Sequence, residues 1–152
     1  MDFSAPYFPV RVMLVVPRAQ PVRQLTDLAG TTLATMHGTT YEKALLAGVP
    51  HVHLVYGLDE AALLDMVAAG KARAAAMDSA VAYGLLPSYA QLRLGIPLSP
   101  EQGLAFAVAK GSPLAGQLSK TIGQLKASKI YYRLLEQHLG AEAAKLVAAG
   151  KG

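Results

Sequence analysis

The chain has 152 residues, of which 53% are hydrophobic and 16% charged, and its formal net charge is +4. This length allows one domain with a proper core but not two full ones, and the composition is that of a folded chain rather than a disordered one. No apolar run approaches the roughly 20 residues that span a bilayer. The absence of cysteine excludes disulfides, thiolate metal ligands and a cysteine nucleophile.

Runs rich in β-branched or small apolar residues are predicted to be strands. In chain order these runs are residues 10–16, 31–36, 51–56, 72–78, 90–95 and 103–110. Segments with helical spacing or helix-capping signals alternate with them, and everything beyond residue 113 is predicted to be helical. In chain order the predicted helical segments are 24–30, 40–48, 59–70, 79–86, 114–127, 130–139 and the tail from 141. The alternation predicts an α/β fold with a largely parallel sheet flanked by helices.

The stretch MHGTTYEKALLAG, from Met36 to Gly48, reads as the end of a strand, a glycine turn and a helix. Thr39 followed by Glu42 fits a capping box, in which each side chain satisfies a backbone N–H at the helix start. Gly48 suits the C-terminal end of that helix. Two interpretations stay open here: ordinary capping, or a helix start at Gly38, Thr39 and Thr40 that binds an anion.

Asp78 is the second candidate, because it ends a run of small apolar residues that is predicted to be a buried strand. A carboxylate in that position is partly desolvated and needs a cation or several donors. The alternative is that Asp78 caps the following helix, with Ser79 assisting. In an α/β sheet, ligands bind outside the carboxyl ends of the strands, and both candidates are expected at such ends.

Other patterns argue against catalysis and against metal or nucleic-acid binding. His51 and His53 point to the same face of a predicted strand, but no third ligand stands nearby, so no metal is expected. Lys126, Lys129 and Arg133 form a stripe interpreted as a solvated helix face, since nucleic-acid binding needs a larger patch. The chain contains no nucleophile elbow, phosphate loop or dinucleotide fingerprint, and no cofactor is expected.

The order of several segments resembles the bacterial extracellular solute-binding proteins of the polar amino-acid type, family 3 with the type II fold. The segments are DFSAPY, LTDLAGTTLATMHGTTYE, the alanine-rich strand ending in Asp78, LSPEQGLAFAVAKGSPL and LKASKIYYRLLEQHLG. The resemblance covers Asp2 to about Gly140. In that family two α/β lobes, joined by hinge strands, close over a ligand.

The resemblance implies a division of the chain. Residues 1–16 would be the end of the first lobe and the first hinge strand, and 17–100 the second lobe. Residues 101–111 would be the return hinge strand and 112–152 the C-terminal helices. Most of the first lobe, with the arginine that relatives place against the ligand carboxylate, is expected to be missing. Weak binding by this chain alone is therefore expected.

The resemblance also implies a function without chemistry: the periplasmic solute-binding component of an ABC importer, presenting its closed form to a membrane permease. It assigns the helix start at Gly38, Thr39 and Thr40 to the α-carboxylate of an amino acid or similar zwitterion. It assigns Asp78 to the α-amino group. Arg73 is a departure, because relatives often carry an acidic residue a few positions before the binding aspartate, and this leaves the charge balance around Asp78 open.

Partners and alternatives follow from the same resemblance. Hinge strands and C-terminal helices without their usual neighbours are expected to expose apolar surface, which favours a homodimer. One alternative is a cyclohexadienyl or arogenate dehydratase on this scaffold, with His37 as the suspected acid–base group. Another is the ligand-binding domain of a sensor. A third, the effector domain of a cytoplasmic transcription regulator, is disfavoured because no DNA-binding helix pair is present.

Overall fold

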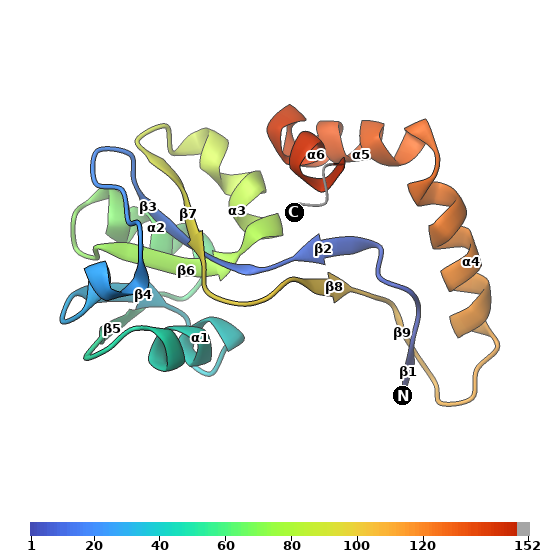
Figure 1. Ribbon diagram of the computed structural model, residues 1–152, viewed down its shortest axis with the longest axis horizontal. Coiled ribbons are helices and arrows are strands. Elements are labelled where there is room, and N and C mark those ends of the chain that lie inside the picture. Colours follow the sequence, from blue (N-terminus) through green and yellow to red (C-terminus); the bar gives the residue numbers. More distant parts are fainter. Residues whose placement is uncertain (149–152) are drawn as a thin grey trace. The chain divides into compact units, whose positions relative to one another are not determined.

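The computed structural model describes residues 1–148, and the chain divides into two compact units (Figure 1). One unit is Arg11–Pro100, and the other combines Met1–Val10 with the segment that starts at Glu101. In the described residues, no helix is both long and apolar enough to span a bilayer. The two units are described separately below.

The Arg11–Pro100 unit is built on a five-stranded sheet with the order β5-β4-β6-β3-β7 (Figure 1). The strands are β3 (Val12–Pro17), β4 (Thr32–Thr35), β5 (His53–Tyr56), β6 (Ala74–Asp78) and β7 (Leu92–Pro97). β4 runs parallel to β5 and to β6, whereas β3 is antiparallel to β6 and β7. All strands except β3 therefore run in the same direction, which confirms the predicted α/β class with a mostly parallel sheet.

Short helices connect these strands. They are the 3-10 turn η1 (Leu25–Leu28), α1 (Thr40–Gly48), α2 (Glu60–Ala68), α3 (Ser79–Leu85) and the 3-10 turn η2 (Leu86–Ser88). Two of these helices, α1 and α2, begin at the positions predicted from their N-cap residues. Thr39 caps α1, and Asp59 caps α2 by accepting a hydrogen bond from Ala62 N at 2.8 Å. A side-chain oxygen at this position satisfies one of the backbone donors that a helix start leaves without a partner.

The core of this unit lies against β6. Its first four residues, from Ala74 to Met77, are completely buried, and α1, α2 and α3 all contact the strand. Parallel strands covered on both faces have continuous apolar sequences, and here three alanines let the helices approach closely. Leucines from the surrounding elements complete the core: Leu14, Leu28, Leu33, Leu45, Leu63 and Leu64.

The other unit has two short antiparallel ribbons and three helices. β1 (Asp2–Phe3) pairs with β9 (Ala107–Val108), and β2 (Phe8–Val10) pairs with β8 (Gln102–Leu104). The helices are α4 (Leu114–Lys126), α5 (Lys129–Leu139) and α6 (Ala141–Ala148). Tyr131 is buried, and its hydroxyl donates to Tyr7 O at 2.7 Å, which ties α5 to the chain beside β2.

Several local predictions are corrected. The predicted strand 10–16 breaks at Arg11 into β2 and β3, and the predicted strand 103–110 breaks into β8 and β9. His51 has a positive φ of 51° in a turn before β5, so it does not share a strand face with His53. Gly48 is the last residue of α1 and does not take the left-handed conformation. Lys126 donates to Pro6 O at 3.4 Å, so it is not simply a solvated member of a stripe.

Candidate functional site

The sequence-predicted site residues come together at one edge of the sheet. β4 and β6 are adjacent and parallel, with Leu33 opposite Ala74 and Ala34 opposite Ala75. Their carboxyl ends therefore meet at the same edge. β4 leads into the turn at Gly38 and the start of α1, while β6 ends at Asp78. β5, which is parallel to β4, brings Tyr56 to this edge as well.

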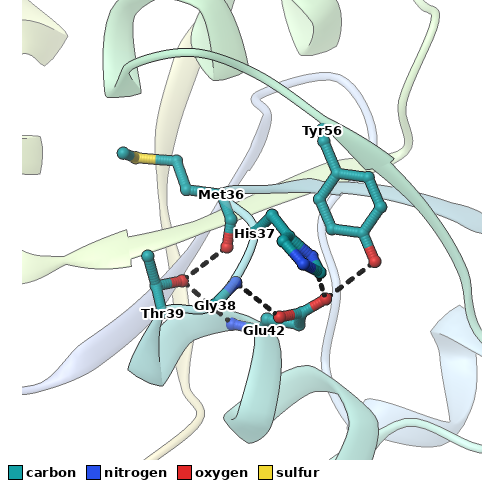
Figure 2. A network of polar contacts seen from close by, with 6 residues as sticks. All are labelled: Met36, His37, Gly38, Thr39, Glu42 and Tyr56. Atoms are coloured by element: carbon teal, nitrogen blue, oxygen red, sulfur yellow. Dashed lines mark hydrogen bonds and ion pairs between the residues drawn. The ribbon is translucent and has the colours of Figure 1, made fainter.

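The turn before α1 is fixed by glycine geometry and by Thr39. Gly38 has a φ of +74°, a conformation that side chains with a Cβ rarely adopt. The Thr39 hydroxyl donates to Met36 O at 2.7 Å and accepts from Glu42 N at 3.4 Å (Figure 2). Since one hydroxyl bonds backbone groups on both sides of the turn, it sets the direction in which α1 leaves the strand.

The side-chain carboxylate of Glu42 lies at the start of α1, where an external anion was expected to bind (Figure 2). It accepts a hydrogen bond from Gly38 N at 2.7 Å and another from the Tyr56 hydroxyl at 2.7 Å. Nδ1 of His37 lies 3.3 Å from the same carboxylate. Only half of the expected capping box forms: Thr39 accepts from Glu42 N, but the Glu42 carboxylate accepts from Gly38 N, one residue before the cap, and not from Thr39 N.

This network shifts the protonation of its members. The hydrogen bond from Tyr56, followed by that from Gly38 N, lowers the pKa of Glu42 below its usual value. The same bond raises the pKa of Tyr56. Glu42 is therefore ionised at neutral pH, and the Gly38 N–H is already used. Of the three predicted residues, Thr40 offers an external ligand the most accessible donors, because it is exposed and the N–H of a first helical residue has no intrahelical partner.

Asp78 occupies the N-cap position of α3 but makes no side-chain capping bond. Ser79 was expected to assist Asp78 in capping α3, but its hydroxyl accepts a hydrogen bond from Arg11 N at 3.2 Å instead. Burial is the main cause that raises the pKa of Asp78, the charge of Glu60 adds to it, and a hydrogen bond with the Tyr41 side chain opposes it. The capping interpretation of the Asp78 side chain is therefore wrong, and a partly desolvated carboxylate is left at the sheet edge.

Tyr41 links the two halves of the candidate site. It follows Thr40 in α1, its side chain interacts with Asp78, and its hydroxyl donates to Glu60 at 3.3 Å. Burial, together with the charges of Asp78 and Glu60, raises the pKa of Tyr41 to about 12. Tyr41, Tyr56 and Glu60 were not predicted from the sequence. The one signal available was that each stands within a few residues of a predicted strand or helix end at this edge.

Arg73 does not change the charge balance at Asp78. It precedes β6 at the other end of the strand, and its Nη1 donates to Gln20 O at 3.0 Å. Residues 1–148 contain no cluster of three or more histidine, cysteine, aspartate or glutamate side chains that could hold an ion. His37 is exposed and lies edge-on to the Tyr56 ring, with 5.3 Å between ring centroids.

No family model matches the chain. It is similar to the membrane-bound lytic murein transglycosylase F of Desulfosudis oleivorans, with 29% identity over 147 residues, which are 92% of this chain and 32% of that protein. Among solved structures it is similar to the substrate binding protein of an amino acid ABC transporter, with 28% identity and a TM-score of 0.71. That match covers 90% of this chain and 62% of the other.

Two further structures extend the comparison. An ancestral cationic amino acid solute binding protein is 26% identical with a TM-score of 0.80, over 91% of this chain and 62% of that one. The L-cystine solute receptor of Neisseria gonorrhoeae, at 23% identity, shows the fold alone, with a TM-score of 0.78 over 94% of this chain and 62% of that one. The chain has the type II solute-binding fold. The predicted resemblance is thereby confirmed, and the chain spans less than two thirds of each of these proteins.

Within this solute-binding fold, Glu42→Gln tests the network at the start of α1. The pKa of Glu42 is lowered in the folded state, so its stabilisation is present above the ordinary value of 4.5 and is lost as the pH falls through the folded value. The variant should therefore melt at a lower temperature than the wild type at pH 7, with a difference that shrinks in acid. Thermal melts from pH 7 to pH 3 measure it. Glu142→Gln, which alters an exposed pair with Lys145, is the matched control, and equal melting of Glu42→Gln and the wild type at pH 7 would contradict the assignment.

Asp78→Asn should have the opposite effect on stability. The pKa of Asp78 is raised by folding, so the ionised carboxylate destabilises the fold above that raised value, and the penalty disappears below the ordinary value of 3.8. Asparagine removes the charge, so the variant should melt higher than the wild type at pH 7 and equally at low pH. Asp65→Asn is the control, because Asp65 is exposed and accepts from the Tyr89 hydroxyl at 2.9 Å. A lower melting temperature for Asp78→Asn at neutral pH would show that the carboxylate is structural.

Proposed function

We propose that this chain is a binding lobe of a solute-binding protein that takes an amino acid or a similar small zwitterion. The observation that carries the proposal is the uncapped, partly desolvated Asp78 carboxylate at the same sheet edge as the start of α1. A zwitterion needs a carboxylate at one end and hydrogen-bond donors at the other, and the ends of two neighbouring strands supply both. The ABC transporter protein and the cationic amino acid binder, which share this fold at 26–28% identity, support the ligand class.

The proposed roles differ among the residues. Asp78 binds the ammonium group of the ligand. The ion pair that they form offsets the free-energy cost of burying the Asp78 carboxylate. Thr39 and Thr40 bind the ligand carboxylate through the α1 N-terminus, where the helix dipole adds roughly 0.3–1 kcal/mol. Gly38 contributes its left-handed conformation, since Glu42 occupies its N–H.

We also propose how the parts of the chain correspond to the lobe, the hinge strands and the C-terminal helices of a complete solute-binding protein. Residues 17–100 would be one lobe, 1–16 and 101–111 would contain the hinge strands, and 112–152 the C-terminal helices. The division of the chain after Val10 and before Glu101 supports hinges near these positions. In the periplasm the protein would close around its ligand, and a membrane permease of an ABC importer would recognise this closed form. A homodimer through exposed hinge or C-terminal surfaces is part of the proposal, and exposed Phe106, Ile130 and Leu134 support it.

A second candidate is a ligand-binding domain that controls an attached enzyme or sensor. It is favoured by the similarity to the transglycosylase, of which this chain matches 32%. In that arrangement the same lobe would bind the same class of ligand without catalysing a reaction. A dehydratase is a weaker third candidate. An ancestral amino acid-binding protein described as a precursor of cyclohexadienyl dehydratase has this fold at 26% identity, and incubation with prephenate or arogenate would reveal such an activity.

An amide-resolved NMR titration of the chain with a panel of amino acids tests the binding proposal, since this method detects weak complexes. The ligand should shift the amides of Thr39, Thr40 and Ser79, and Asp78→Asn should weaken binding by about tenfold or more, equivalent to about 1.4 kcal/mol. A deaminated carboxylic acid should bind wild type and variant equally, because it has no ammonium group. Asp65→Asn is the control. Unchanged affinity in Asp78→Asn, or shifts confined to other parts of the unit, would reject the proposal.

A further inference from the structure

A hollow in the Arg11–Pro100 unit lies at the opposite edge of the sheet from Asp78. It has a volume of about 540 Å³, which lies within the range of small-ligand pockets. Residues from the amino ends of β4 and β6, the end of antiparallel β3 and the start of β7 line it. Among them are Pro17, Gln20, Thr32, Lys71, Arg73 and Leu92. The proposed amino-acid site does not use any of these residues.

The charged side chains that line this hollow are all positive. Lys71 and Arg73 are its charged lining residues, and no lining residue is acidic. Arg73 donates one hydrogen bond, from Nη1 to Gln20 O at 3.0 Å, which holds the guanidinium in place and leaves its remaining N–H groups available in the described structure. The planar fork of arginine matches the oxygens of a carboxylate or phosphate. Lys71 is exposed and adds a mobile point charge.

Neighbouring groups do not neutralise this pair. On α2, the Asp65 carboxylate accepts from the Tyr89 hydroxyl at 2.9 Å, and within the described residues no ion pair joins Lys71 or Arg73 to an acidic side chain. The C-terminal end of α2 also borders the hollow, and such ends carry partial negative charge. Two of its carbonyls are already paired: Val67 O accepts from Gly70 N, and Met66 O accepts from Lys71 N and Ala72 N. Arg18, which donates through Nε to Ala90 O at 2.8 Å, adds a third cation on the adjoining loop.

We propose that this hollow is a second binding site, for a small organic oxyanion with a short apolar body. Lys71 and Arg73 would hold the carboxylate or phosphate group, while Pro17, Val67 and Leu92 provide apolar wall. Because the lining has no carboxylate, it has nothing to pair with an ammonium group. The site therefore selects anions, whereas the edge at Asp78 selects zwitterions, and the proposal does not depend on what binds at Asp78.

Amide-resolved NMR titrations of the chain with inorganic phosphate, butyrate and butylamine test this site. Phosphate or butyrate should shift the amides of Lys71, Ala72 and Arg73, and butylamine should not. Tighter binding of phosphate would identify a phosphate ester as the ligand class, and tighter binding of butyrate a carboxylate. Lys71→Gln should weaken anion binding about tenfold, since it removes a charge-assisted hydrogen bond to the ligand oxygens.

Lys43→Gln is the matched control, because Lys43 is an exposed lysine on α1 in the same unit. It should leave anion binding unchanged. Lys71 makes no side-chain hydrogen bond within the described residues, so its replacement should not affect folding. Arg73→Lys should keep the positive charge but lose the planar fork of N–H groups that matches the oxygens of the anion. Equal weakening by Lys71→Gln and Lys43→Gln, or no anion-dependent shift at residues 71–73, would overturn the proposal.

Discussion

The carboxylate of Asp78 lies where a fully buried strand reaches the edge of its sheet, and the loss of water around it raises its pKa. The residues before it, from Ala74 to Met77, are small or apolar and completely buried, and α1, α2 and α3 all contact this strand. Such a strand stabilises the fold through burial, but it delivers its last side chain into a poorly hydrated position. A charge held there without a capping bond is the feature on which the proposed ammonium site rests.

Parallel strand order then brings the second half of the candidate site to Asp78. β4 and β6 are neighbours and run in the same direction, so α1 begins beside the carboxylate rather than at the far edge. Glu42 organises that helix start from within by joining Gly38 and Tyr56, residues that follow or end different strands. Glu42 accepts from Gly38 N and the Tyr56 hydroxyl, whereas the Asp78 carboxylate makes no capping bond and interacts with the Tyr41 side chain, so the two carboxylates have different partners.

The sequence predicted features that depend on near neighbours. Thr39 and Asp59 cap the helices that follow them, and the alanine-rich run ending at Asp78 is a buried strand, because capping and burial patterns are local. Contacts that join distant segments were not predictable in the same way. Tyr56 bonds to Glu42 across 14 positions, and only the pairing of β5 with β4 brings them together.

Other errors have equally physical causes. The continuous β-rich run around Arg11 divides because its two parts pair with different strands, and pairing choices are not encoded in β-propensity. The capping alternative for Asp78 was reasonable for a carboxylate before a helix, yet its side chain makes no capping bond. The separation of Arg73 from Asp78 follows from strand geometry, since Arg73 immediately precedes β6 and Asp78 is its last residue.

The most direct measurement is the titration of the Asp78 side-chain carboxyl carbon by NMR, in the free chain and with an amino acid present. The account predicts a pKa above the ordinary value of 3.8 in the free chain, and a fall when the ligand ammonium pairs with the carboxylate. A pKa at or below the ordinary value that does not respond to any amino acid would contradict it.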